Sequence, residues 1–192
     1  MTIHPIQLFG EWDQGWALDI HTISSEYIGD DPFGHPRYDT TRSYIGELMY
    51  QLKYQVNTSV LPAIVDEVTG LLESKGLLSS IDLIIPAPPT KDRTFQPVFA
   101  IAEAVAKQND IFFSDDALVK TSSLEAKSMD WSAKKKLKGS VHFTKEFIRP
   151  CNVLLIDDVY ETGSTLKACV NALREDPKTG KIYVLTITKT RR

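Results

Sequence analysis

The stretch NVLLIDDVYETGSTLKACVNAL, residues 152–173, decides which fold the chain adopts. It begins as an unbroken apolar run, reaches two adjacent carboxylates, passes through a turn rich in hydroxyl groups, and ends with apolar residues at helical spacing. An apolar run of this kind is typical of a strand that is buried on both faces, as in a parallel sheet. The stretch therefore predicts a strand at 152–156 and a helix from about 163 to 174.

The rest of the chain alternates between the same two patterns. Further strands are predicted at 15–24, 80–90, 117–121 and 181–189, and helices at 40–56 behind a threonine cap, at 58–76 and at 96–108. Residues 28–40 are crowded with Gly, Pro and Asp and are predicted to form a loop, while the polar, basic segment 122–140 is predicted to be mobile. Strands that alternate with helices predict an α/β fold, with a mainly parallel central sheet flanked by helices.

The composition is that of an ordinary globular protein. The chain has 192 residues, 42% of them hydrophobic and 24% charged, which suits one domain with a sizeable core. A formal net charge of −3 argues against a general nucleic-acid-binding surface. The two cysteines, Cys151 and Cys169, have neither metal-ligand spacing nor a disulfide framework. Since no signal peptide and no membrane span are visible in the sequence, a soluble cytoplasmic protein is expected.

Asp157 and Asp158 lie where the buried strand is expected to end. Two neighbouring carboxylates that are partly removed from water repel each other, so the pKa of at least one should rise unless positive groups or donors compensate. A metal ion would compensate, and so would a polyol, because carboxylates accept hydrogen bonds from vicinal hydroxyls. The pair therefore indicates a site for a diol or a metal ion.

The turn ETGST, residues 161–165, opens the predicted helix. The first N–H groups of a helix have no intrahelical partner and carry the positive end of the helix dipole. Gly163 lets the backbone approach a ligand closely, so a phosphate group fits here. Alone, a pair of acids before a helix is usually a solvated cap, and such a turn is common. Together, at this spacing, a diol site and a phosphate site describe a binder of ribose 5-phosphate.

Two other classes of protein place acids after an apolar strand. In receiver domains the acid pair follows the first strand, but only 34 residues follow Asp158, which is too few for the rest of that fold. A Walker B strand would accompany the motif G-x-x-x-x-G-K-[ST], which the sequence lacks. The short remainder of the chain argues against a receiver domain, and the missing motif argues against a Walker B strand.

The thirteen residues VLLIDDVYETGST, 153–165, resemble the phosphoribosyl pyrophosphate (PRPP) signature of the type I phosphoribosyltransferases. The resemblance implies a parallel-sheet core with a variable hood, and Mg²⁺-PRPP as donor. Asp157 and Asp158 would then hold the ribose 2′- and 3′-hydroxyls. Glu161 is a candidate general base or contact to the acceptor base, because purine-specific members often have an acidic residue at this place. The loop around the 5′-phosphate would comprise Tyr160, Glu161, Thr162, Gly163, Ser164 and Thr165.

Two other segments are similar to the ComF-like branch of the amidophosphoribosyltransferase relatives. These are IIPAPPTKDRTFQPVFAIAEAVAK at 84–107 and GELMYQLKYQ at 46–55, and the resemblance spans roughly 45–190. No cysteine precedes Cys151, so the four-cysteine zinc module that is frequent in that branch is missing. The cysteine nucleophile that releases ammonia from glutamine is missing too. Glutamine-dependent chemistry is therefore not expected of this chain alone.

The pyrophosphate leaving group of PRPP needs cations and hydrogen-bond donors, because negative charge develops on it as it departs. A candidate loop follows the strand at 80–90 and comprises Pro88, Pro89, Thr90, Lys91 and Arg93, although its charged residues would also suit a solvated loop. By the resemblance, Lys120 and Lys127 are candidate catalytic cations, the second on a loop that closes over the site. The lysine run 134–136 is interpreted as a solvated face rather than a nucleic-acid site.

Residues 1–40 match nothing in the resemblance and are expected to form a hood or irregular segment before a core at 41–192, within one phosphoribosyltransferase-like domain. Trp12, Trp16 and Tyr27 would either stack an acceptor base under this hood or pack in the core, and the sequence leaves both alternatives open.

The expected activity is transfer of a 5-phosphoribosyl group from Mg²⁺-PRPP to a nitrogen of a nucleobase or amine, with release of pyrophosphate. Mg²⁺ is expected to arrive with PRPP and to have no direct protein ligand, and no pair of histidines has metal-ligand spacing. A homodimer is compatible with the resemblance, whereas nucleic-acid and membrane partners are not expected. The alternative is a non-catalytic PRPP- or nucleotide-binding protein of ComF type, which regulates or assists DNA uptake.

Overall fold

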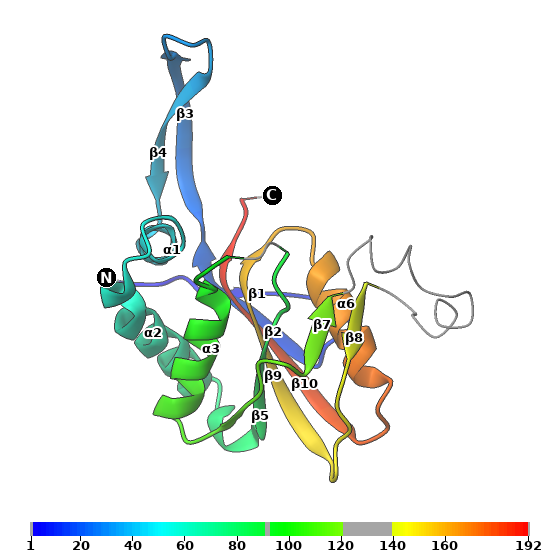
Figure 1. The fold of residues 1–192 in the computed structure, drawn as a ribbon. Coiled ribbons are helices and arrows are strands. Elements are labelled where there is room, and N and C mark those ends of the chain that lie inside the picture. Colours follow the sequence, from blue (N-terminus) through cyan, green and yellow to red (C-terminus); the bar gives the residue numbers. More distant parts are fainter. Residues whose placement is uncertain (1, 91–92, 121–139, 192) are drawn as a thin grey trace, which may run out of the picture.

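The computed structural model describes residues 2–90, 93–120 and 140–191. At its centre lies a six-stranded sheet in the order β1-β2-β10-β9-β5-β6 (Figure 1). β1 runs antiparallel to β2, and all other neighbours in this sheet are parallel. The strands are β1 (Ile6–Gln7), β2 (Gln14–Ile20), β5 (Leu83–Pro86), β6 (Phe112–Phe113), β9 (Cys151–Tyr160) and β10 (Thr179–Lys189). The predicted α/β fold with a mainly parallel sheet is confirmed.

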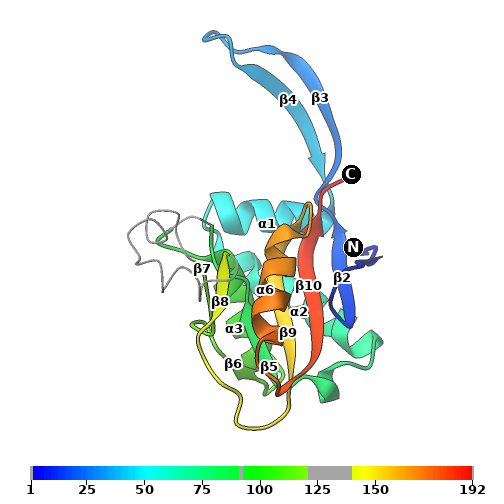
Figure 2. The same cartoon turned by 90° about the vertical axis from the view of Figure 1, so that its right-hand side faces the viewer.

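Both faces of the sheet are covered (Figures 1 and 2). One face carries α1 (Tyr44–Tyr54), α2 (Leu61–Ser74) and α3 (Pro97–Gln108). The other carries α6 (Ser164–Arg174) and the antiparallel pair of β7 (Leu118–Lys120) and β8 (Val141–Phe143). Side chains of the strands alternate between the two cores, as the two-residue period of a strand requires. In β9, Leu154 and Ile156 face α1–α3, whereas Val153 and Leu155 face α6.

The two central strands extend further than β5. β9 pairs with β5 only as far as Ile156, opposite Pro86, whereas it pairs with β10 as far as Tyr160. The chain leaves the sheet after a last bond of 2.8 Å from the Ala87 N–H to the Ile156 carbonyl. The carboxyl end of β9 is therefore open on the β5 side, and ligands of parallel sheets bind at such an edge.

A long β-hairpin projects from this edge of the sheet (Figures 1 and 2). It consists of β3 (Thr22–Asp30) and β4 (Pro36–Arg42), with Tyr27 directly opposite Tyr38. The prediction of a loop at 28–40 was wrong, because the turn-forming residues are confined to a short tip. There the Asp31 carboxylate accepts hydrogen bonds from backbone N–H groups of the tip and fixes the turn.

Within the expected hood segment, β1 and β2 belong to the central sheet, whereas β3 and most of β4 form the projecting hairpin. β2 pairs along β10 from Gln14 to Ile20, and five consecutive residues of β2 are buried. The strand that was predicted at 15–24 is divided at His21, whose N–H donates to the Lys189 carbonyl at 2.7 Å. The expected boundary between residues 40 and 41 falls inside β4.

The helices match their predicted positions, with shifts at their ends. α1 begins one residue after Ser43, rather than at a threonine cap, and the Ser43 Oγ accepts from the Gly46 N–H at 3.0 Å. The short 3₁₀ turns η1 (Thr58–Val60) and η2 (Leu78–Ser80) flank α2. α2 ends before Gly76, which adopts a φ of 65°. In the three described ranges, no helix is both long and apolar enough to cross a membrane.

Candidate functional site

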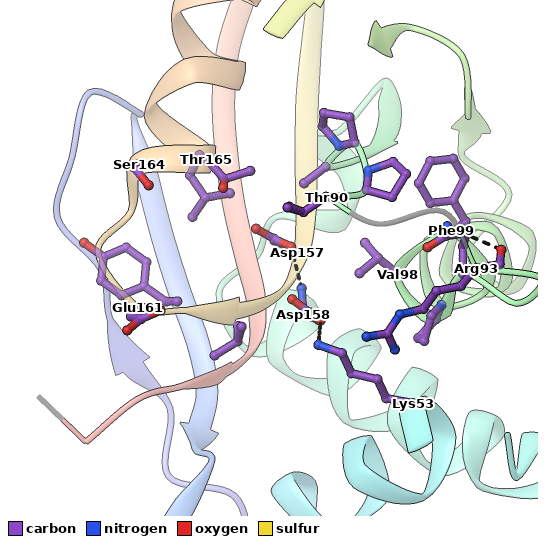
Figure 3. A pocket seen from close by; sticks show the side chains of 18 of the residues that line it. Lys53, Thr90, Arg93, Val98, Phe99, Asp157, Asp158, Glu161, Ser164 and Thr165 are labelled. Carbon is purple, nitrogen blue, oxygen red and sulfur yellow. Dashed lines mark hydrogen bonds and ion pairs between the residues drawn. The ribbon is translucent and has the colours of Figure 1, made fainter. Parts of the chain in front are cut away.

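A pocket of about 440 Å³ lies beyond the end of β5, within the size range of small-molecule sites (Figure 3). It is bounded by the acid pair of β9, the turn before α6, the loop after β5 and the neighbouring ends of α1 and α3. Its lining comprises Lys53, Tyr54, residues 87–90, Arg93, residues 96–99 and residues 157–166. Segments that are far apart in the sequence thus share one cavity at the carboxyl edge of the sheet.

The two carboxylates of β9 enter the pocket from opposite faces of the strand, because successive side chains alternate. Continuing the alternation of Leu155 and Ile156, Asp157 lies on the α6 side and Asp158 on the α1 side. The Asp158 N–H donates to the Asp157 Oδ1 at 2.8 Å, and the Asp158 carbonyl accepts from the Thr188 hydroxyl at 3.1 Å. The backbone of the acid pair is therefore tied to β10.

One carboxyl of the pair has a raised pKa, as the sequence predicted. Burial and the negative charge of Asp158 raise the pKa of Asp157 to about 7, although the Asp158 N–H and the positive charge of Lys53 act in the opposite direction. Burial, together with the Asp157 charge, also raises the pKa of the Cys169 thiol on α6 to about 12. A charge on Asp157 is thus unfavourable until a cation or donor compensates it.

A lysine from α1 reaches the other carboxylate. Lys53, in the last turn of the helix, forms an ion pair with Asp158, as Figure 3 shows. Next to it, Tyr54 lines the pocket, and its ring centroid lies 5.9 Å from the Lys53 Nζ and 5.8 Å from the Arg93 guanidinium carbon. The α1 side of the pocket therefore combines an aromatic ring with two positive groups.

The turn before α6 brings backbone amides to the pocket. Gly163 adopts a φ of 75°, in the left-handed region, and is the residue that precedes the helix. A bond of 2.8 Å from the Lys167 N–H to the Gly163 carbonyl begins the helical ladder, so the earlier N–H groups of this turn lie outside it. A Cβ atom at Gly163 would lie 2.9 Å from the Tyr160 ring. The prediction that ETGST opens a helix is confirmed.

The loop after β5 lies across the pocket from this turn. Pro88, Pro89, Thr90 and Arg93 all line the cavity. Lys120, at the end of β7, donates from its Nζ to the Thr90 Oγ1 at 3.2 Å. The structure thus joins the loop to one of the two lysines that the resemblance singled out. All peptide bonds in the described ranges are trans, including those before the two prolines.

Some predicted site residues are not accounted for by the structure. Lys91, Lys127 and the lysine run 134–136 lie outside the described residues. Glu161 lines the pocket beside the turn, as predicted, with its side chain exposed. Their roles therefore remain predictions.

The two tryptophans are core residues, which decides between the two alternatives that the sequence left open. Trp16 packs in the core under α1–α3 and Trp12 in the core under α6, and each is 9% exposed. Trp12 also meets the Tyr160 ring edge-on, with the ring centroids 6.5 Å apart, so it packs against the residue from which the turn before α6 begins. Tyr27 lies on the hairpin, and no described residue before Lys53 lines the pocket.

Sequence reasoning missed the contribution of α1 and α3. Lys53, Tyr54, Val98 and Phe99 lie in predicted helices and in segments that carry the ComF-like resemblance, but none of them was predicted to line the site. All four line the pocket. One signal was available for Lys53, because it follows the buried Leu52 on a helix whose other face is apolar. A pairing with a residue 105 positions later has no local signature.

The residues present fit a metal ion that is carried by a ligand. Among the described residues, no group of three or more His, Cys, Asp or Glu side chains is placed to hold a metal ion. The pocket does offer the negative charge of two adjacent carboxylates beside the turn before α6, which favours a cation such as Mg²⁺ that takes most of its ligands from water and from the molecule that carries it.

Several solved structures share this architecture. Adenine phosphoribosyltransferase from Saccharomyces cerevisiae, solved with an imino-altritol bisphosphate and adenine, is 12% identical with a TM-score of 0.51, covering 87% of this chain and 85% of that chain. Adenine phosphoribosyltransferase from Rhodothermus marinus is 15% identical, with a TM-score of 0.44 over 86% of this chain and 93% of that chain. This chain has the type I phosphoribosyltransferase fold.

UMP synthase from Leishmania donovani is 14% identical with a TM-score of 0.40, and the match covers 83% of this chain but 27% of the synthase. No family model matches the sequence, and no curated protein matches it significantly. At these identities the likeness concerns the fold alone, and the ComF-like branch remains a prediction from the sequence.

Proposed function

We propose that this protein is a phosphoribosyltransferase, which binds PRPP with Mg²⁺ and transfers the 5-phosphoribosyl group to a nitrogen of a nucleobase or amine. The observation that carries the proposal is the single pocket in which an acid pair, a helix N-terminus and a loop next to a lysine meet. Each of these groups matches one part of the donor: the ribose diol, the 5′-phosphate and the pyrophosphate.

The ribose and its phosphate would lie along β9 and the turn before α6. Asp157 and Asp158 accept hydrogen bonds from the 2′- and 3′-hydroxyls, which compensates the cost of placing two negative charges next to each other in a buried position. The 5′-phosphate takes the N–H groups around Gly163 and the hydroxyls of the neighbouring residues, where the helix dipole favours an anion. The loop comprises Tyr160, Glu161, Thr162, Gly163, Ser164 and Thr165.

The pyrophosphate would lie at the loop after β5, close to Thr90, Arg93 and Lys120. The bond from the ribose C1′ to the pyrophosphate oxygen breaks as the acceptor nitrogen forms its bond to C1′. Negative charge develops on the leaving pyrophosphate, so positive groups stabilise the transition state more than the bound substrate. The proposal also assigns Pro88, Pro89 and Lys91 to the pyrophosphate loop, and Lys127 to the cations that stabilise the leaving group.

An acceptor nitrogen that carries a proton must lose it during the reaction. Glu161 is the candidate base, because it lines the pocket beside the phosphate turn. Mg²⁺, when bound, neutralises the charge that the pyrophosphate oxygens gain as they leave. The yeast enzyme with the same fold was solved with a bisphosphate and a base together, which supports a site with two anionic ends and a flat acceptor.

The experiment is a pyrophosphate-release assay with PRPP, Mg²⁺ and a panel of nucleobases and amines, beside a melting-temperature measurement with PRPP alone. We expect PRPP to raise the melting temperature and at least one acceptor to release pyrophosphate. A rise without release by any acceptor would favour the ComF-type regulator over the enzyme. No rise at millimolar PRPP would contradict both.

Asp157→Asn/Asp158→Asn tests the diol assignment, and it should bind PRPP about 100-fold or more weakly, since two charge-assisted hydrogen bonds are lost. The matched control is Glu26→Gln/Asp39→Asn, which neutralises two carboxylates that lie directly opposite each other on the hairpin. This control should bind PRPP as the wild type does.

A further inference from the structure

The ion pair between Lys53 and Asp158 is largely removed from solvent. The Lys53 side chain is 24% exposed and the Asp158 side chain 19%. Removing one member of such a pair leaves the other charge partly desolvated and without its partner, which costs more than losing a surface pair. Lys53 therefore affects the electrostatics of the acid pair, unlike a lysine on the solvent-exposed face of α1.

The position of Lys53 is set by the start of its helix. Ser43 caps α1 and donates from its Oγ to the Ile20 carbonyl at 2.5 Å, which ties the helix to the end of β2. Gly46 lies against the same strand end, where a Cβ atom would come within 2.2 Å of the His21 carbonyl oxygen. A helix held this closely to the sheet directs its last turn at the end of β9.

Other charged groups also face the acid pair. On the α1 side, the charge of Asp158 reaches His21, whose pKa is lowered by burial and by the positive charges of Arg42 and Lys53. Arg42 in turn pairs with Glu47 at 3.4 Å. Arg93 shares the Tyr54 ring with Lys53, and Lys120 approaches from β7. Among these groups of the described ranges, Lys53 is the one that forms an ion pair with Asp158. Because the pKa of His21 is lowered, the imidazole loses its proton at lower pH than usual and contributes less to changes in the pair above pH 6.5.

We propose that Lys53 is a positioning residue of the donor site, which orients the Asp158 carboxylate and offsets part of the negative charge of the acid pair so that the pair accepts the ribose hydroxyls. The inference rests on the proposed function, because it assigns Lys53 a role in binding PRPP. A carboxylate has lone pairs for several donors, so Asp158 accepts from Lys53 and from a hydroxyl together.

The proposal determines the direction of a pH effect. Without Lys53, the acid pair loses its nearest positive charge, so protonation of the pair becomes easier and the pKa of Asp157 rises further. The hydroxyls then meet a protonated carboxyl over a wider pH range. The fall in PRPP affinity on the acid side should therefore begin at higher pH in a variant without this charge.

The test measures PRPP affinity by calorimetry with Mg²⁺ between pH 6.5 and 8.5 for the wild type, Lys53→Met and Lys53→Arg. Lys53→Met should bind about 30-fold more weakly at pH 7 and regain affinity towards pH 8.5. Lys53→Arg keeps the charge and should stay within about threefold of the wild type. The matched control is Lys107→Met, which removes the same charge from the last turn of α3.

Lys107→Met should leave both the affinity and its pH dependence unchanged. The proposal is overturned if Lys53→Met keeps the affinity of the wild type, or if it weakens binding equally at every pH without rescue by Lys53→Arg. Failure of the proposed function has a different signature, because the wild type itself would then not bind PRPP. In that case the pH dependence of unfolding still tests the coupling: curves for Lys53→Met and the wild type that run parallel would refute it.

Discussion

The two halves of the pocket have different origins. The acid pair and the turn before α6 come from one continuous run, residues 157–166, on β9 and the start of α6. The opposite wall depends on Lys53 and Tyr54, and Lys53 meets a partner 105 positions away. The geometry of the first half follows from a strand, a glycine and a helix start. The second half exists only because α1 packs closely on the sheet, so it should be more sensitive to changes in packing.

Gly46→Ala should displace α1, which carries the second half of the pocket, and we expect from it the largest loss of stability. The new Cβ would lie 2.2 Å from a backbone oxygen of His21, so α1 has to move away from the sheet. We expect the free energy of unfolding to fall by about 3 kcal/mol, the upper end for overpacking a core. Because Lys53 moves with the helix, PRPP binding should weaken as well. Chemical denaturation and calorimetry measure the two effects.

Gly70→Ala is the matched control for this variant. Gly70 lies inside α2, and no atom comes within 4 Å of a Cβ built there. Alanine favours a helix over glycine by about 1 kcal/mol, so this variant should gain stability. A loss in both variants would show that the contact with His21 is not the cause.

The pH dependence of the free energy of unfolding reports on the charge of Asp157, in the first half of the pocket, rather than on the geometry of that half. The raised pKa of Asp157 means that, between pH 4 and about 7, the folded state binds more protons than the unfolded state. The contribution of Asp157 to stability therefore falls as the pH rises through this range, by about 2 kcal/mol between pH 5 and 8. The lowered pKa of His21 acts in the opposite direction below pH 6.5.

Asp157→Asn isolates this contribution, since His21 is common to both proteins. The stability advantage of the variant over the wild type should grow by about 2 kcal/mol between pH 5 and pH 8. Denaturation curves that stay parallel from pH 5 to 8 would contradict the raised pKa.

Gly163→Ala tests the turn of the first half. Alanine at a φ of 75° costs about 1–2 kcal/mol, and its Cβ meets the Tyr160 ring. PRPP affinity should fall about tenfold, because the N–H groups of the turn no longer converge. Gly29→Ala is the control, since Gly29 has a φ of 98° on the hairpin with no atom within 4 Å of its Cβ position. It should lose stability and keep the affinity; an equal loss of affinity in both would refute the role of the turn.

The hairpin should contribute least to the stability of the protein and to PRPP binding. Tyr27 and Tyr38 meet with ring centroids 5.9 Å apart, and they are 59% and 56% exposed. Replacing both by alanine should cost about 1 kcal/mol or less, the value of an exposed cross-strand pair. PRPP binding should not change, since the hairpin does not line the pocket. A change in affinity would mean that the hairpin acts on the site from a distance.

The sequence predicted what depends on neighbours along the chain. The apolar run before Asp157, the turn at Gly163 and the helical spacing beyond it lie in one stretch, so the strand, the start of the helix and the raised pKa all followed from it. The extension of β9 to Tyr160 was missed, because it depends on pairing with β10 rather than on apolar residues.

What could not be predicted depends on packing across the sheet. Residues 28–40 have the composition of a loop, yet cross-strand pairs such as Tyr27 with Tyr38 form a ladder around a short tip. The sequence around Lys53 does not predict that Asp158 is its partner, because the sheet order that brings α1 to the end of β9 is a property of the whole chain. The resemblance pointed to the same helix and gave it no role.

The hairpin and the central strands should also respond differently to solvent. β10 lies between β2 and β9, so its amides are bonded and covered by helices on both faces. The amides of β3 and β4 have only each other, on a ribbon that stands clear of the body (Figure 2). Deuterium should therefore enter the hairpin long before it enters β10, and a protease should cut first at the tip, residues 31–35, while the edge of the sheet that lines the pocket stays folded.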